Sequence, residues 1–458
     1  MSYKSVLANT ANVKLRVLGL AGVVAMAATV GPAVADLLPT PVTLIPVPPD
    51  QANVQPGQAF TSFDISFADP VLSLAGTGNI FIADRSNASV DIFSGSSLTF
   101  LGRAIGFAGQ TGNNNTSGAD GVLTVTSGGV TTLYAGDGNS TLKVFNVTTT
   151  ATTASATMQA NIATGSPSLF RVDEMAFSPQ SNQVLAANNA ATPAFGSLFS
   201  TSSGHPPVAL IGTPPPGNQI TIPGQPAAGG LEQPVWNPQT ITNGPSFWIS
   251  VPQLTAVATN PGGVAQISTT GAVLQTKDFG NSLLFPGISS GGCSPTGLAV
   301  SASGNMLVGC GNAGTQAILL DKNGNFLKIV GAGVLGGTDE IWYDPKTDKF
   351  YVTGGPGGSA PGQRFFDVVD ANGNILQTVN VPTTSSAHSI TVDPVTGDVF
   401  VALADTSNGI TNTVCPLGCI AVFGQAVPGP IAGAGLPGLI LAAGGLVALA
   451  RRRRQKIA

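Results

Sequence analysis

The chain has 458 residues, of which only 9% are charged, and it contains 59 glycines and 34 prolines. This composition is typical of a turn-rich β protein, and helical periodicity is almost absent. All 22 acidic residues lie within residues 36–426, whereas eight of the 18 basic residues lie outside that segment. The segment is therefore strongly acidic, which argues against nucleic acid and anionic lipid as partners and is compatible with divalent cations or with simple solubility.

The first 35 residues have the pattern of a secretory signal peptide. Basic residues precede an uncharged apolar run, and small residues suited to cleavage follow it; these are Lys4, Lys14 and Arg16, then residues 17–30, then Ala33, Val34 and Ala35. We therefore expect residues 1–35 to be removed during export and residues 36–426 to form the exported domain.

One pattern recurs along residues 36–426: an acidic or polar residue, an alternating apolar strand, a turn built on Pro, Gly or Asn, and a second strand. The last apolar residues of the predicted first strands are Phe67, Val125, Phe177, Trp236, Val300, Tyr343 and Val392. They are on average about 54 residues apart, a period that fits one four-stranded sheet with generous loops. Further strands are predicted around Asn-Gly hairpin turns at Asn323 and Asn372.

Four-stranded sheets repeated radially form a β-propeller. We therefore predict an all-β fold, a single propeller with seven blades over residues 36–426. Six blades is the alternative, because residues 201–230 are rich in Pro and Gly and their strands are hard to place. The last repeat lacks an outermost strand after residues 420–423, and the apolar segment 42–47 is expected to supply it and close the ring.

The four cysteines fit an oxidising compartment. Cys293 and Cys310 flank residues 296–308, which are predicted to form a β-hairpin whose open end brings the two sulfurs together. Cys415 and Cys419 form a tight C-x3-C loop. We predict two disulfides with these pairings. A zinc site is the weaker alternative, because such sites normally recruit more Cys or His nearby and the only histidines are His205 and His388.

Residues 427–458 form a tail with three parts. Val427, Pro428, Gly429 and Pro430 precede twenty uncharged residues at 431–450, which are followed by Arg451, Arg452, Arg453 and Arg454. At about 1.5 Å of rise per residue, a helix of this length just crosses the hydrocarbon core of a bilayer. We predict a transmembrane helix at 431–450, with the arginines on the cytoplasmic side.

The order of these parts resembles the PEP-CTERM sorting signals of Gram-negative bacteria, with Gly429 where that family usually carries Glu. The resemblance covers only residues 427–458. It implies cleavage by an exosortase-like membrane enzyme and transfer to the cell surface or the extracellular matrix. The alternative is a plain stop-transfer anchor that holds the domain on the outer face of the inner membrane.

Three strings resemble the superfamily of NHL-type and lactonase-like propellers: FIADRSNASVDIF at 81–93, EIWYDPKTDKFYVTG at 340–354 and SITVDPVTGDVFVAL at 389–403. The resemblance implies a propeller fold. For the lactonase-like members it also implies a divalent metal at the tunnel mouth, which polarises a carbonyl oxygen and activates water. Propellers host hydrolases, oxidoreductases, binding platforms and inert spacers, so the fold alone settles no function.

Polar residues stand at the entrance to the first strand of successive repeats. Because first strands line the tunnel of a propeller, we expect them to converge near its axis. The candidate metal ligands are Asp64, Asp173, Glu174, Glu232, Asp339, Glu340 and His388. Such a cluster would suit a divalent cation such as Ca²⁺. The alternative, which we favour, is that these residues cap the tunnel mouth and accept hydrogen bonds from backbone amides, because they match no complete ligand motif.

The leading functional hypothesis is an exported, non-enzymatic propeller that acts as a binding module at the envelope or in the matrix of a Gram-negative bacterium. Its expected partners are an exosortase-like processing enzyme, a surface or matrix ligand, and the membrane through residues 431–450. The alternative is a metal-dependent hydrolase of lactone-type substrates that uses the acidic tunnel mouth. No set of residues in the sequence forms a convincing catalytic group.

Overall fold

The computed structural model describes residues 38–424, with gaps at 39–40, 42, 50–59, 70–77, 128, 167–168, 202–208, 211–218, 258–260, 289–291, 312–315, 332–336, 355–364, 382–387, 405–414 and 416. The predicted signal peptide at 1–35, His205 and the tail at 427–458 therefore lie outside the described residues. Within the described part of the chain, no helix is long and apolar enough to cross a membrane.

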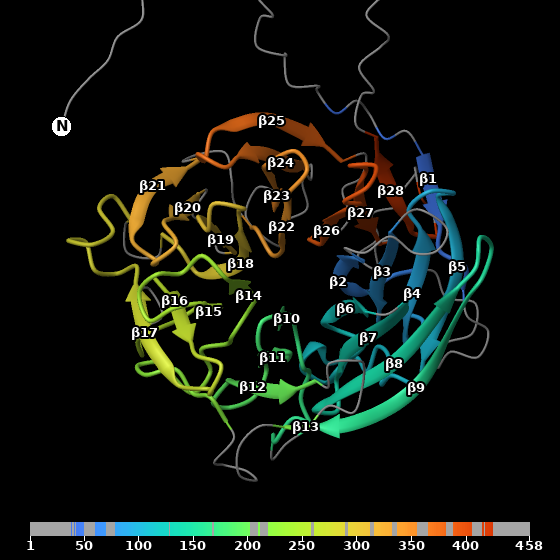
Figure 1. Ribbon diagram of the computed structural model, residues 1–458, viewed down its shortest axis with the longest axis horizontal. Helices are drawn as coiled ribbons and strands as arrows, with labels where there is room; N and C mark the ends of the chain where they lie inside the picture. Colours follow the sequence, from blue (N-terminus) through green and yellow to red (C-terminus); the bar gives the residue numbers. More distant parts are fainter. Residues whose placement is uncertain are drawn as a thin grey trace, which may run out of the picture. The chain divides into compact units, whose positions relative to one another are not determined.

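The described residues form seven antiparallel four-stranded sheets arranged as a propeller (Figure 1). This confirms the predicted all-β fold and shows that the six-blade alternative was wrong. Blade 1 contains β2 (Phe63–Ala68), β3 (Asn79–Asp84), β4 (Ser89–Ser94) and β5 (Thr99–Ile105). Blade 2 contains β6 (Val122–Ser127), β7 (Val130–Asp137), β8 (Thr141–Thr149) and β9 (Ala154–Ala163). A short 3-10 helix, η1 (Asn114–Thr116), lies between these two blades in sequence.

Blades 3 to 5 follow in chain order. Blade 3 contains β10 (Met175–Ser178), β11 (Gln183–Asn188), β12 (Phe195–Ser200) and β13 (Ala209–Leu210). Blade 4 contains β14 (Pro234–Asn237), β15 (Ser246–Val251), β16 (Gly263–Ile267) and β17 (Val273–Asp278). Blade 5 contains β18 (Pro295–Val300), β19 (Met306–Cys310), β20 (Ala317–Leu320) and β21 (Phe326–Val330). Within its described residues, the Pro- and Gly-rich region contributes the two-residue strand β13 to blade 3.

The last two blades include the closure of the ring. Blade 6 contains β22 (Ile341–Asp344), β23 (Lys349–Gly354), β24 (Phe365–Asp370) and β25 (Ile375–Asn380). Blade 7 contains β26 (Ile390–Val392), β27 (Val399–Leu403) and β28 (Cys419–Phe423), and its outermost strand is β1 (Thr43–Pro46). The strands β1 and β28 pair antiparallel, with Ile45 opposite Ile420. The prediction that the N-terminal apolar segment closes the ring is confirmed.

The core is divided into seven hydrophobic clusters, each formed between two adjacent blades. The middle strands β3, β4, β15 and β16 are buried along their whole length because each blade is covered on both faces. The outer strand β17 is only half-buried throughout. Because both faces are covered, even the polar residues of these strands, such as Asp91 in β4 and Ser250 in β15, are buried.

The Asn-Gly turn between β20 and β21 is fixed by its sequence. The carboxylate of Asp321 accepts hydrogen bonds from the backbone N–H groups of Asn323 and Asn325, each at 2.8 Å. Gly324 has a φ of +76°, and a Cβ there would lie 2.6 Å from the Trp248 ring of blade 4. Glycine is therefore required both by the turn and by the close packing of two blades.

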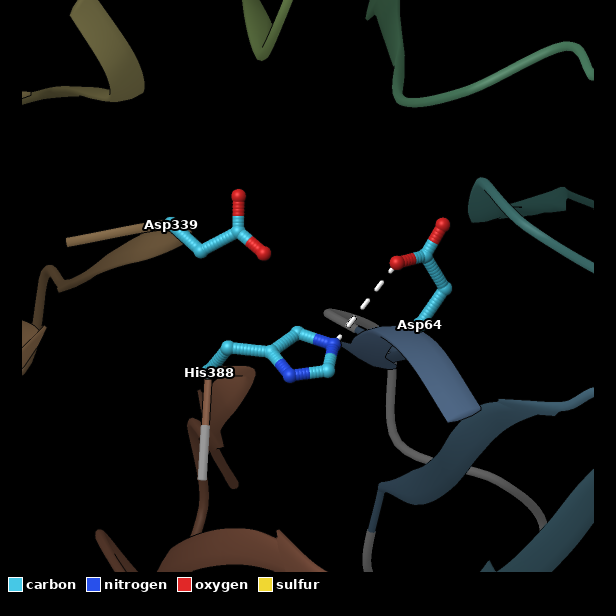
Figure 2. A group of neighbouring side chains, drawn as sticks. All are labelled: Asp64, Asp339 and His388. Carbon is cyan, nitrogen blue, oxygen red and sulfur yellow. Dashed lines mark ion pairs between the residues drawn. The ribbon is translucent and has the colours of Figure 1, made fainter. Parts of the chain in front are cut away.

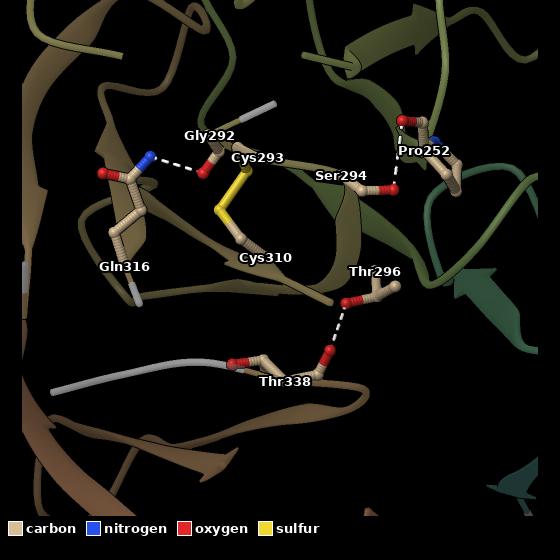
Figure 3. Close-up of a disulfide and its surroundings, with 8 residues drawn as sticks. All are labelled: Pro252, Gly292, Cys293, Ser294, Thr296, Cys310, Gln316 and Thr338. Carbon is tan, nitrogen blue, oxygen red and sulfur yellow. Dashed lines mark hydrogen bonds between the residues drawn. A yellow bond between two sulfur atoms is a disulfide. The ribbon is translucent and has the colours of Figure 1, made fainter. Parts of the chain in front are cut away.

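Both predicted disulfides are present, Cys293–Cys310 and Cys415–Cys419. The first joins the segment before β18 to the end of β19 (Figure 3). Around it, the Ser294 hydroxyl donates to the Pro252 carbonyl at 3.2 Å and the Thr296 hydroxyl donates to the Thr338 carbonyl. The disulfide therefore lies where the end of β15 in blade 4 is held against the entrance segments of blades 5 and 6.

Candidate functional site

The structure brings six of the seven candidate ligands together in two groups at the entrance to the first strands. In each group, one ligand atom from every residue lies within 4.8 Å of the others. The first group draws on blades 1, 6 and 7, and the second draws on blades 3 and 4. The groups are Asp64, Asp339 and His388, and Asp173, Glu174 and Glu232. Glu340, the seventh candidate, belongs to neither.

The first group surrounds an imidazole (Figure 2). His388 Nε2 lies 3.7 Å from Asp64 Oδ1, and the Asp339 carboxylate comes from the opposite side of the same space. The ring of His388 stacks on Phe63, with centroids 4.4 Å apart and planes 2° from parallel. The stacking fixes the plane of the imidazole, and Asp64 fixes which ring nitrogen faces the carboxylates.

Two arginines at the same entrance were not predicted as site residues. Arg85 donates to Asp64, to Asp120 from Nε at 2.7 Å, and to the Asn114 side chain at 2.8 Å. Arg171 lies 3.1 Å from Asp173 and 3.5 Å from Asp64. Their only sequence signal is rarity, since residues 36–426 contain four arginines and two of them are used here.

The arginines make Asp64 different from the other carboxylates. Burial alone would raise the pKa of Asp64, but Arg85, His388 and Arg171 outweigh it and hold that pKa well below its usual range. Asp64 is therefore ionised and already neutralised by protein cations. Asp120 shares Arg85 and is completely buried, and burial raises its pKa well above the ordinary value.

The second group has fewer positive neighbours. Burial raises the pKa of Asp173 to about 7, although Arg171 counteracts it. Burial and the neighbouring carboxylates raise the pKa values of Glu174 and Glu232 well above the ordinary value. Glu174 is 3% exposed, and its Oε2 atom has no hydrogen-bond partner among the residues that the structure describes. Three crowded carboxyl groups of this kind favour protons or a bound cation.

Glu340 has a different environment from the two groups. Its Oε2 atom accepts hydrogen bonds from the Ser389 hydroxyl, from the Ile390 N–H at 3.1 Å and from the Ser66 hydroxyl at 3.4 Å. Burial raises the pKa of Glu340 to about 8 despite the bonds from Ser389 and Ile390. These contacts tie the first strands of blades 6, 7 and 1 together.

A cavity of about 480 Å³ lies along the first strands and is lined in part by two of these carboxyl groups. Its polar end is formed by Glu174, Gln233 and Glu340, and the rest of its wall is mainly apolar and aromatic. All three glutamates of the chain therefore lie at this entrance, because the remaining one, Glu232, belongs to the second group. The rarity of glutamate is visible in the sequence, whereas the gathering of all three at one entrance is shown by the structure.

A scan against models of known protein families found no match to the chain, and a search of curated proteins also found none. The fold and the site together define a seven-bladed β-propeller with an acidic tunnel entrance that two arginines only partly neutralise. Chemically, the entrance can hold cations, accept hydrogen bonds and exchange protons near neutral pH.

Proposed function

We propose that the chain is an exported β-propeller that acts as a binding module at the cell envelope or in the matrix, with the acidic tunnel entrance as its binding surface. The observation that carries this proposal is the group of Asp173, Glu174 and Glu232, whose ligand atoms lie within 4.8 Å of one another. Oxygen ligands gathered in this way suit Ca²⁺, which prefers carboxylates and tolerates irregular geometry. A bound cation would replace the protons that burial otherwise imposes on these groups.

Export and sorting are proposed on the sequence patterns of residues 1–35 and 427–458. An exosortase-like enzyme would remove the tail, and the propeller would then reach the surface or the matrix. Intact-mass analysis of the cell-surface form tests this step. A mass that lacks Arg451 to Arg454 supports sorting, whereas an uncut mass supports the plain anchor.

Cation binding is tested by calorimetric titration of the purified protein, first stripped with a chelator, with Ca²⁺, Mn²⁺ and Zn²⁺. We expect Ca²⁺ to bind the wild type and the control variant Asp278→Asn, which changes a carboxylate on the outer strand β17. The double variant Glu174→Gln/Glu232→Gln should lose binding. A wild-type protein that takes up none of the three ions contradicts the proposed site.

A metal-dependent hydrolase is the second candidate, and the group of Asp64, Asp339 and His388 is the observation that favours it. A cation on the carboxylates would polarise the carbonyl of a lactone, while His388 would take a proton from the attacking water and return it to the leaving ring oxygen. Lactone hydrolysis that requires added metal and disappears in His388→Gln would support this candidate. Metal binding without any hydrolysis would contradict the hydrolase and favour the proposal of a binding module.

A further inference from the structure

The tunnel cavity has properties that the entrance groups do not share. First strands of six blades line it, and its aromatic side chains are Phe67, Phe177, Trp236, Trp342 and Tyr343. Phe67 and Trp342 come from blades 1 and 6 and meet edge to face, with centroids 5.1 Å apart. Its volume of about 480 Å³ lies within the usual range for sites that bind small molecules.

The polar end of the cavity includes a buried carboxyl oxygen, Glu174 Oε2, that has no hydrogen-bond partner within the described chain. Gln233 is engaged at both polar atoms, because its side-chain oxygen accepts from the Leu298 and Ile341 amides and its nitrogen donates to the Ile341 carbonyl. Glu340 is engaged through Oε2, as described above. Glu174 lines the same space, is 3% exposed, and has no partner for Oε2 within the described chain.

These features of the cavity favour a ligand that carries a positive charge and an apolar part. An uncharged apolar molecule in the cavity would remove water from Glu174 and leave the carboxyl group without a partner, which is unfavourable. A hydrated metal ion would meet mostly apolar walls and too few oxygen atoms. An organic cation suits both the polar end and the aromatic wall of the cavity. Its charge pairs with the carboxylate, and its cationic carbons are attracted to aromatic rings.

We infer that the tunnel binds a small organic cation, an alkyl- or arylammonium compound whose charge lies against Glu174 and whose apolar part packs among the aromatic side chains. This site is separate from the proposed Ca²⁺ site in its ligand chemistry and shares only Glu174 with it. It does not depend on export or on metal binding. A titration in the presence of a chelator therefore isolates it from the proposed function.

The test compares phenyltrimethylammonium with tert-butylbenzene, its uncharged carbon isostere, in calorimetric titrations of the full chain with excess chelator. We expect the cation to bind at least about tenfold more tightly, because the two compounds have the same shape and differ only in charge. Binding should also change the fluorescence of Trp236 and Trp342, since two of the three tryptophans of the chain line the cavity. Equal affinities, or no binding of either compound, would overturn the inference.

Variants of the protein test whether Glu174 is the residue that recognises the positive charge of the ligand. Glu174→Gln should weaken the cation by at least about tenfold and leave tert-butylbenzene unchanged, whereas Asp278→Asn should change neither. An unaltered affinity of Glu174→Gln for the cation would show that Glu174 is not its partner and would overturn the inference. Thermal unfolding of each variant verifies that it is folded. If Glu174→Gln does not fold, the comparison of the two compounds on the wild type decides whether the inference stands.

Discussion

Replacing Glu340 with Gln should make the stability of the propeller less dependent on pH. Burial raises the pKa of this carboxyl group from 4.5 to about 8 in the folded chain. A group with a higher pKa in the folded state binds more protons when folded, so its contribution is fully present below pH 4.5 and is lost as pH rises towards 8. At about 1.4 kcal/mol per pH unit, the wild type loses about 5 kcal/mol over this interval as an upper limit.

Gln keeps an oxygen that accepts from Ser389 and Ile390, and it stays neutral like the protonated acid. The free energy of unfolding should be measured by urea titration near pH 5 and near pH 8, with chelator present and tryptophan fluorescence as the signal. The advantage of Glu340→Gln over wild type should grow by several kcal/mol between the two conditions, whereas the difference for Asp278→Asn should stay constant. Parallel pH curves for Glu340→Gln and the wild type would refute the argument.

Three further predictions concern stability at neutral pH, each measured by urea unfolding. Arg85→Met should destabilise the fold by about 3–5 kcal/mol, because it leaves Asp64 and Asp120 buried without their shared cation; a loss below about 1 kcal/mol would mean that these carboxyl groups simply take up protons. Ile45→Ala should cost about 2–5 kcal/mol, because Ile45 is 3% exposed and packs between blades 7 and 1; a negligible loss would show that β1 contributes little to closure. Cys293→Ala/Cys310→Ala should cost about 3 kcal/mol for its loop of 17 residues, and the difference from wild type should disappear in reductant.

The blade repeat could be predicted because its signals are local. Each first strand follows an acidic or polar residue and precedes a turn, so Phe67 and Val392 mark equivalent positions without knowledge of the fold. The closing strand could also be predicted, since only an outer strand was missing from blade 7. Blade 3 was harder, because its outer strand β13 has only two residues and carries little periodicity.

The carboxylates of the entrance could be predicted from the repeat, because equivalent positions in a radial repeat converge. Their ion pairs with arginine could not be predicted. Arg85 follows the second strand of blade 1, not the first, and it reaches Asp120 at the start of blade 2. The raised pKa values of Glu174 and Glu340 depend on burial and on neighbours from other blades, which no local pattern encodes.

The pairing of β1 with β28 also constrains the order in which the molecule can fold. Thr43 and Val422 lie opposite each other in that ladder, so nearly the whole domain must be synthesised before they can meet. As the chain is synthesised, blades 1 to 6 can form in order, each from residues that are close in sequence. Blade 7 can be completed only when β28 pairs with β1, which lies at the other end of the domain sequence. Joining such remote segments carries a large entropic penalty, and ring closure should therefore be the slow final step of folding.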